Sequence, residues 1–350
     1  MEEPRARRRT VLRLTPITLS IALLGIAVAV ALSIGLTYLF TRNAYDTSRK
    51  PKEPDHPGGG DDNPPSAEEL RLPTNIKPLL YNLTIKTYLP GYVDFQSEKN
   101  LTFDAQVLIS MVVVEPTKSI VLNAKKITAL PKECEVFAGD QKLDIESVTD
   151  HERLEKLEFT LKQQLEKDQK IQLKVVYSGL ISDTLGGLYQ ATYKDTDGTT
   201  KIVAVSQMEP TDARRMVPCF DEPSFKANWT VTIIHPRGTT AASNGIETNG
   251  EGEPDGDWIT SKFKTTPRMS SYLLAVIVSE FKYIEGRTKS GVRFRIWSRP
   301  EAVKMTKFAL DAGVRCLEFY EKFFDIRFPL EKQDMVALPD FSAGAMENWG

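Results

Sequence analysis

Alternating apolar and polar residues predict strands through most of the chain after residue 73. In the segment 82–88, Leu83, Ile85 and Thr87 alternate with their neighbours, as expected of a half-buried strand. Comparable runs rich in β-branched residues lie at 101–114, 119–122, 157–161, 171–177, 201–205, 229–234 and 258–263. Turn signals such as Asp197-Gly198 separate many of these runs, and no helical periodicity intervenes. The pattern therefore predicts an antiparallel β-sandwich-like domain over 73–281.

The pattern changes after residue 282. The run 292–298 predicts one more strand, and Ser298 with Glu301 has the spacing of a capping box at the start of a helix. Apolar residues then recur at steps of three and four, which predicts one helical face packed in a core. These residues are Met305, Ala309, Ala312, Cys316, Phe319 and Phe323. A short strand is predicted at 334–338, so 282–350 reads as a mixed α and β region.

The N-terminal region carries an uncharged apolar run at 17–40. As a helix it would span roughly 36 Å at about 1.5 Å per residue, which is enough to cross a bilayer core. The alternative, a cleaved signal peptide, requires a shorter apolar run. We therefore expect a cytoplasmic tail (1–16), a transmembrane signal anchor (17–40) in the lipid bilayer and a flexible stalk (41–72), whose Pro, Gly and charged residues cannot form a core.

The orientation of this anchor is predicted from two features. A dense arginine cluster precedes it on a short tail, although basic residues at 42–52 also follow it. Three N-x-S/T sequons, at Asn82, Asn100 and Asn228, could be glycosylated only outside the cytoplasm. Together they favour a single-pass type II protein of the plasma membrane whose folded part is extracellular.

Composition excludes some partners. The chain is 41% hydrophobic and 26% charged with a net charge of −2, so we expect no nucleic-acid partner, which would need a strongly basic face. The three cysteines, Cys134, Cys219 and Cys316, are too few and too widely spaced for a disulfide framework or a C-x-x-C metal site. We expect Cys219 and Cys316 to be small buried apolar residues.

The three histidines do not form a recognised metal motif. His56, His151 and His235 contain no pair at i, i+4. The stretch that begins at His151-Glu152 superficially imitates H-E-x-x-H, but Glu155 stands where the second histidine would be. We therefore expect His151 to lie in a surface loop, and no metal ligand in this chain.

Two long motifs carry a specific resemblance. One runs from Gln207 through Asp221-Glu222-Pro223, and the other, at 338–350, contains Gly-Ala-Met-Glu-Asn at 344–348. Both resemble the aminopeptidase N family of zinc exopeptidases, and the segment 270–281 is similar to the end of that family's first domain. The resemblance implies a β-rich N-terminal domain over 73–281, followed at 282–350 by the truncated start of a thermolysin-like α+β catalytic domain.

The resemblance implies an activity, the removal of single N-terminal residues from peptides. A protonated amine taken out of water needs carboxylate or carbonyl acceptors. In the family, the motif glutamate and an acceptor from the first domain hold that amine, and the motif's first residues form an edge strand that pairs with the substrate backbone. The substrate-binding residues implied in this sequence are Gln207, Glu209, Gly344, Ala345, Met346, Glu347 and Asn348.

Two further roles depend on the same resemblance. Glutamine at 207, where members that prefer acidic residues have aspartate, favours neutral or basic first residues. For Asp212 and one of Arg214 and Arg215 we expect a structural ion pair, although a surface charge run is the alternative. The segment 221–223 reads as a structural turn.

The family's catalytic apparatus is not expected in this chain. Its zinc is held by H-E-x-x-H and a distant glutamate, which follow the 344–348 motif, and its catalytic tyrosine lies further on. We therefore expect no catalytic residue and no hydrolysis by this chain alone. The zinc cofactor would belong to the complete protein.

Three functions remain open at this point. The first is a fragment of a type II membrane aminopeptidase that acts on peptides through their free N-terminus. The second is a non-catalytic ectodomain that binds peptide N-termini or partner proteins. An adhesion-type β-sandwich glycoprotein is the third, and the two long motifs argue against it. Whether the protein forms a homodimer is left open.

Overall fold

The computed structural model describes residues 64–350. The predicted tail (1–16), membrane anchor (17–40) and most of the stalk (41–72) lie outside the described residues, as does His56. In the described range, no helix combines the length and the apolar character needed to cross a membrane.

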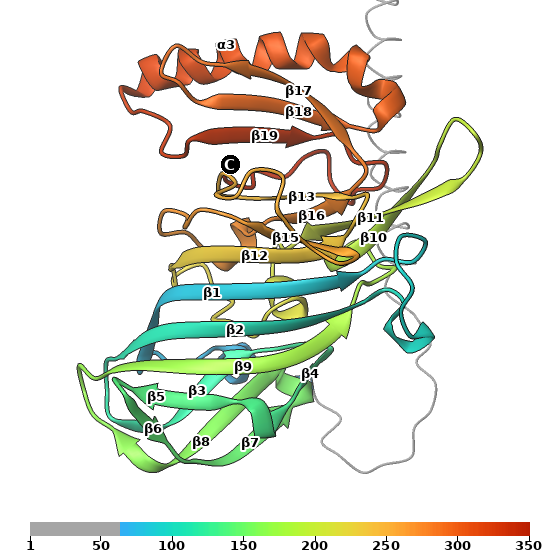
Figure 1. Ribbon diagram of the computed structural model, residues 1–350. Coiled ribbons are helices and arrows are strands. Elements are labelled where there is room, and N and C mark those ends of the chain that lie inside the picture. Colours follow the sequence, from blue (N-terminus) through green and yellow to red (C-terminus); the bar gives the residue numbers. More distant parts are fainter. Residues whose placement is uncertain (1–63) are drawn as a thin grey trace, which may run out of the picture. The chain divides into compact units, whose positions relative to one another are not determined.

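The largest element is a nine-stranded sheet in the order β14-β15-β12-β1-β2-β9-β5-β6, with β4 also paired to β9 (Figure 1). Two-residue loops close its short hairpins, as at β5–β6 and at β14–β15. Its strands are β1 (Ile76–Tyr88), β2 (Thr102–Val113), β4 (Ile127–Ala129), β5 (Glu135–Ala138), β6 (Gln141–Leu143), β9 (Lys170–Leu180), β12 (Asn228–Pro236), β14 (Glu253–Asp255) and β15 (Trp258–Lys262).

One pairing in this sheet differs from the all-antiparallel prediction. β1 pairs with β12 in parallel, with Leu83 opposite Val231. A tight turn would force two consecutive strands to run antiparallel, but β12 reaches β1 only after a long excursion of the chain, so its direction is not fixed locally.

A second, three-stranded sheet covers the large one and completes the predicted sandwich. It contains β3 (Thr117–Asn123), β8 (Lys156–Leu165) and β7 (Ile145–His151), in that order. Val107 and Ile109 of β2 share one buried cluster with Leu122 of β3 and Phe159 of β8. The chain is therefore mainly β, with a sandwich-like core, as its alternating pattern predicts.

A four-stranded sheet follows, in the order β10-β11-β16-β13. Its strands are β10 (Gly187–Lys194), β11 (Thr200–Gln207), β16 (Val276–Ser279) and β13 (Thr240–Ser243). β10 and β11 form the predicted hairpin around Asp197-Gly198, where Gly198 adopts a φ of 85° that favours glycine. Tyr189, Val205 and Ile277 on this sheet form a second apolar cluster with Trp297.

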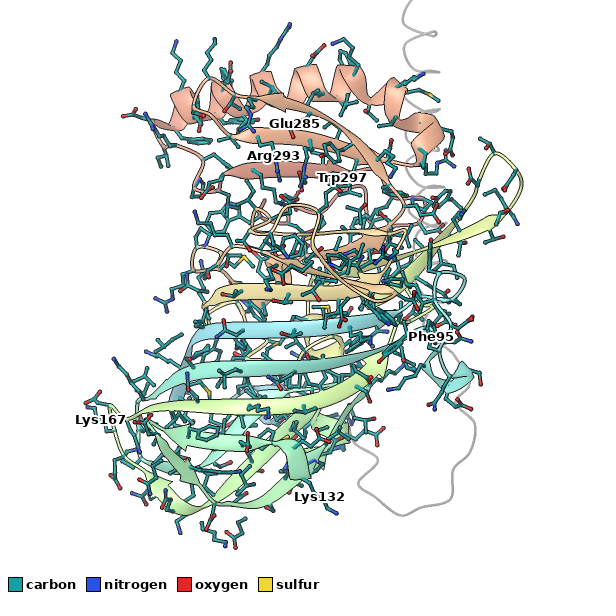
Figure 2. The ribbon with its side chains drawn as sticks, viewed as in Figure 1. Phe95, Lys132, Lys167, Glu285, Arg293 and Trp297 are labelled. Atoms are coloured by element: carbon teal, nitrogen blue, oxygen red, sulfur yellow. The ribbon has the colours of Figure 1, made fainter. Side chains whose placement is uncertain are left out.

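The region after 281 contains a three-stranded sheet beneath one helix (Figure 1). The sheet has the order β17 (Lys282–Arg287), β18 (Arg293–Ser298) and β19 (Lys332–Val336), and β18 pairs with β19 in parallel. Phe294 and Ile296 of β18 pack on helix α3 (Lys307–Phe324). Arg293 and Trp297, labelled in Figure 2, alternate onto the opposite face.

The predicted capping box at 298–301 does not form. Ser298 lies at the end of β18, and its hydroxyl donates to the Arg299 carbonyl oxygen. A 3₁₀-helix, η6 (Pro300–Thr306), intervenes before α3 begins at Lys307. Other short 3₁₀-helices are η1 (Ser97–Lys99), η2 (Pro131–Glu133), η3 (Glu152–Leu154), η4 (Ala213–Arg215) and η5 (Ser271–Leu273).

The predicted inner face of α3 is wrong. Leu310, Val314 and Leu317, with Ala309, pack on the sheet, whereas Phe319 and Phe323 are 58% and 67% exposed. Met305 and Cys316 are exposed as well, so the expected burial of Cys316 is wrong, while Cys219 is buried as expected. The helix is apolar on two sides, and periodicity alone does not say which side meets the sheet.

The end of the predicted stalk folds against the β-sandwich core. Residues 64–72 contain a short helix, α2 (Ala67–Leu70), closed by a capping box between Ser66 and Glu69. Leu72 is buried, and the Lys156 ammonium donates to the carbonyl oxygens of Glu69 and Arg71 at 2.5 and 2.7 Å. The stalk prediction missed these contacts because its composition does not reveal long-range partners.

Candidate functional site

The two long motifs meet at Gln207, the last residue of β11. Its side-chain amide contacts the Glu209 carbonyl oxygen at 3.4 Å and the Met346 sulfur at 3.8 Å. Gln207 is buried, and its amide oxygen has no hydrogen-bond partner among residues 64–350. Glu209 and Glu347 are both exposed. The Gln207 side chain thus joins two segments that are 139 residues apart in the sequence, and each segment has an exposed carboxylate.

We call residues 340–350 the strap, because it is attached near both ends. At its start, the Tyr189 hydroxyl of β10 donates to the Asp340 carbonyl oxygen at 2.9 Å, and the Thr192 amide donates to the Asp340 carboxylate at 3.4 Å. Phe341 packs on the apolar cluster of the four-stranded sheet. The beginning of the strap is therefore fixed to β10.

The far end of the strap is held by side chains from other segments. The Asn244 amide nitrogen donates to the Trp349 carbonyl oxygen at 2.8 Å, and Lys332 donates to that of Gly350 at 2.5 Å. The Asn348 side chain donates to the Leu273 carbonyl oxygen at 3.2 Å. Tyr189, Asn244 and Lys332 were missed by the sequence reasoning, since they bind backbone carbonyls and belong to no motif.

The middle of the strap differs from the expectation. Gly344, Ala345 and Met346 form no strand in the structure, so the edge strand implied by the family resemblance is not observed. Gly344 and Ala345 are exposed, and a Cβ added at Gly344 would have no neighbour within 4 Å. Their backbone therefore faces open space, and its pairing with a substrate stays a prediction.

A buried ion pair fixes the segment that follows Glu209. The Arg214 guanidinium donates to the Asp221 carboxylate at 2.9 Å and to the Glu155 carboxylate at 3.0 Å. Burial would lower the pKa of Arg214, but Asp221 and Glu155 outweigh it and raise that pKa. Arg215 pairs with Asp212 at 3.5 Å, which is the ion pair expected from the sequence. These contacts fix the segment 212–221 internally, and the Asp212 amide donates to the Met208 carbonyl oxygen at 2.8 Å, which connects it to the residues beside Glu209.

A second charged cluster lies beneath the strap. Arg295 donates to the carboxylates of Asp334 and Glu247, and Arg293 pairs with Glu247 as well. Burial alone would raise the pKa of Asp334, but the charges of Lys332 and Arg295 outweigh it and lower that pKa. The cluster thus places two carboxylates against three basic side chains, and the contact of Arg295 with Asp334 links β18 to β19.

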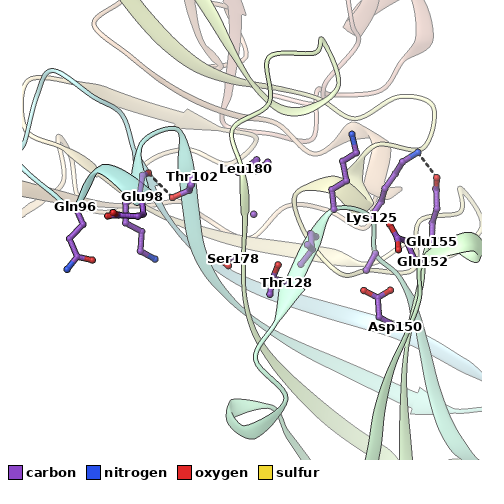
Figure 3. A pocket seen from close by; sticks show the side chains of 15 residues that line it. Gln96, Glu98, Thr102, Lys125, Thr128, Asp150, Glu152, Glu155, Ser178 and Leu180 are labelled. Carbon is purple, nitrogen blue, oxygen red and sulfur yellow. Dashed lines mark hydrogen bonds and ion pairs between the residues drawn. The ribbon is translucent and has the colours of Figure 1, made fainter. Parts of the chain in front are cut away.

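A cavity beside β9 does not contain the predicted site. It has a volume of about 790 Å³ and is lined by β2, β4, β9 and neighbouring loops (Figure 3). Its charged lining mixes lysines with carboxylates, and Lys125 pairs with Glu155 at its rim. None of the predicted substrate-binding residues lines it, so it takes no part in the candidate site.

The three sequons lie in different surroundings. Asn100 is exposed at the end of η1, whereas Asn82 and Asn228 are partly buried on β1 and β12. The Asn228 amide nitrogen donates to the Thr266 carbonyl oxygen at 2.8 Å. Glycosylation stays a prediction at all three positions, and Asn100 has the most accessible side chain of the three.

Residues 64–350 do not fit a catalytic zinc ion, because they contain no group of three metal-ligating side chains. His151 ends β7 instead of lying in a loop, and it contacts Glu158 at 2.9 Å. His235 is buried between the hydroxyls of Thr239 and Ser261. The described histidines are thus structural.

Comparison with known proteins agrees with this arrangement. The Peptidase M1 N-terminal domain model matches residues 77–273, and the Peptidase family M1 domain model matches residues 308–350. The chain is 72% identical to aminopeptidase N of Haemonchus contortus over 98% of its own length and 35% of the relative's. It is 35% identical to human aminopeptidase N over 95% of the chain and 36% of the relative.

A third relative, the puromycin-sensitive aminopeptidase of Caenorhabditis elegans, is 36% identical over 82% of the chain and 29% of the relative. The chain thus spans about a third of the length of these curated relatives. The N-terminal domain model alone matches more than half of the chain. The chain therefore belongs to the M1 family of peptidases.

Proposed function

We propose that this chain provides the groups that bind the substrate amine in an aminopeptidase that removes single N-terminal residues from peptides. We call these groups the amine grip. The observation that carries the proposal is the position of Gln207, whose amide contacts both the Glu209 backbone and Met346. It brings together two segments that each present an exposed carboxylate, from Glu209 and Glu347. Two carboxylates on adjoining segments suit one protonated amine, since a cation removed from water needs charged acceptors.

The same geometry supports cleavage at the chain end. A peptide whose amine is bound between Glu209 and Glu347 cannot extend further in that direction. The exposed residues Gly344 and Ala345, followed by Met346, would then lie beside the first peptide bond. These contacts select substrates with a free N-terminus and exclude internal cleavage.

The preference for neutral or basic first residues belongs to this proposal. Gln207 provides an uncharged amide at the turn, and its amide oxygen has no partner within the described range. A carboxylate at this position would be needed to recruit a cation for an acidic first residue. With an amide at position 207, we expect the enzyme to prefer peptides whose first residue is neutral or basic.

Cofactor and location complete the proposal. Zinc is proposed as the metal of the complete protein, and no step of the reaction is assigned to it because its ligands are not among residues 64–350. The proposed site of action is the outer face of the plasma membrane. The uncharged run at 17–40 and the exposed sequon at Asn100 support that location.

Neutral isosteres of the two carboxylates test the amine grip. In the complete protein, Glu347→Gln and Glu209→Gln should each lower kcat/KM for leucine and arginine arylamides by about 10²-fold, because each removes a charged acceptor. Glu251→Gln, at an exposed carboxylate before β14, is the control. Unchanged kinetics in both variants would refute the grip. Absence of hydrolysis by the complete protein would favour the non-catalytic ectodomain instead.

A further inference from the structure

Lys332 is a buried cation whose three hydrogens are all used. It lies at the start of β19 and is 1% exposed. Its ammonium donates to the carbonyl oxygens of Ser243 at 2.6 Å and Gly350 at 2.5 Å, and it lies 3.1 Å from the Asp334 carboxylate. Each acceptor belongs to a different structural feature: the end of β13, the end of the strap and β19 itself.

This arrangement links the strap to the first domain. A lysine ammonium has three donors and no acceptor, so three acceptors satisfy it completely. A buried cation without such partners would be strongly destabilising. Movement of Gly350 away from Ser243 would therefore leave a donor of Lys332 unpaired. The free-energy cost of losing that hydrogen bond keeps the strap close to β13.

Asn244 provides a second attachment next to the first. It is 1% exposed, its amide nitrogen donates to the carbonyl oxygens of Leu273 and Trp349, and its amide oxygen accepts from the Ala275 amide. The fit is close, because a Cβ at Gly350 would lie 2.1 Å from the Asn244 carbonyl oxygen. No side chain is tolerated there without movement.

Residues on both sides of Glu347 are held by other segments of the chain. Met346 precedes it and contacts Gln207, while Asn348 and Trp349 follow it and are bound to Leu273 and Asn244. The Glu347 side chain is itself exposed. Its backbone position is therefore set by its neighbours and not by contacts of its own.

We propose that Lys332 and Asn244 are positioning residues, which hold the strap so that the Glu347 carboxylate faces the substrate amine. The role rests on the proposed function, since it presumes that Glu347 binds the amine. Neither residue touches the substrate. Their effect on catalysis is therefore exerted through the backbone of 347–350.

The attachment itself is tested by hydrogen exchange in the complete protein. Lys332→Met should raise deuterium uptake in peptides covering 341–350 by several-fold at short times. Lys156→Met is the matched control, because Lys156 is also a buried lysine that donates to two backbone carbonyls. It should raise uptake around 66–72 and leave 341–350 unchanged. Equal uptake at 341–350 in wild type and Lys332→Met would overturn the proposal.

The positioning role is tested by kinetics of the complete protein. Asn244→Ala should raise KM for leucine arylamide about 10-fold and raise the Ki of leucinamide by a similar factor, while kcat changes little. This pattern is expected when a variant binds the amine less tightly in the ground state and in the transition state alike. Asn249→Ala removes a side-chain amide that also bridges backbone groups, at Thr260 and Lys262, and should leave both constants unchanged. A purely structural defect would lower the active fraction without changing KM or Ki, and that result would overturn the role.

Glu347→Gln separates the two proposals. If it raises the Ki of leucinamide while Asn244→Ala does not, only the positioning role fails. If Glu347→Gln leaves that Ki unchanged, the amine grip fails, and the positioning role fails with it. The exchange experiment still reports on the attachment in either case.

Discussion

At the scale of single residues, the buried side chain of His235 is paired at both of its ring nitrogens. His235 on β12 is 1% exposed, and its two ring nitrogens lie 2.8 Å from the Thr239 hydroxyl and 2.9 Å from the Ser261 hydroxyl. Burial lowers the pKa of His235 to about 4. The imidazole is therefore neutral in the folded protein at pH values where an exposed histidine would begin to charge.

This pKa difference predicts an acid-dependent loss of stability. The unfolded chain binds the proton near the ordinary pKa of 6.5 and the folded one only near 4. The free energy of unfolding should therefore fall as pH drops from about 6.5 towards 4, by up to about 3 kcal/mol. In His235→Gln, the free energy of unfolding measured by urea denaturation should depend less steeply on pH over that range. An identical pH slope in the two proteins would contradict the prediction.

Residue-level prediction from sequence was possible only where a motif existed, and the roles assigned to those residues stay predictions. Gln207 and Glu347 were identified because they stand in long, specific stretches. Lys332 and Asn244 were not, because side chains that bind backbone carbonyls leave no pattern of residue types. Only the fold shows that such side chains meet the strap.

At the scale of elements, α3 shows the limit of periodicity. Its inner face contacts Phe294 and Ile296 through Leu310, and Gly313 allows close approach, since a Cβ there would lie 2.5 Å from the Phe294 ring. Its other side exposes stacked aromatic rings, including Phe319 on Phe323. Both sides are apolar, so the sequence predicted the helix but not its orientation.

Two truncations test that orientation. Leu310→Ala should lower the free energy of unfolding by about 2 to 3 kcal/mol, because it leaves a cavity against the sheet. Phe319→Ala removes a larger side chain that is 58% exposed, and it should cost less than about 1 kcal/mol. Urea denaturation of the 350-residue chain measures both. A larger cost for Phe319→Ala would support the orientation first predicted from the sequence.

At the scale of the whole molecule, contacts between distant segments determine features of the fold that local sequence patterns do not predict. Most predicted strands were found, because alternation and turns are local signals. The parallel pairing of β1 with β12 and of β18 with β19 depends on where distant segments return. The candidate site has the same origin, since β11 and the strap meet only in the folded chain. The division at 281 and the substrate-binding roles stay predictions.

The central claim is that Glu209 and Glu347 bind the same amine from two distant segments. A double-mutant cycle with Glu209→Gln and Glu347→Gln in the complete protein tests it most directly, with kcat/KM for leucine arylamide as the readout. If both carboxylates bind one ammonium, the double variant should lose clearly less than the product of the single losses, a coupling of at least about 1 kcal/mol. Strictly multiplicative losses would mean that the two carboxylates act independently, and they would contradict the account.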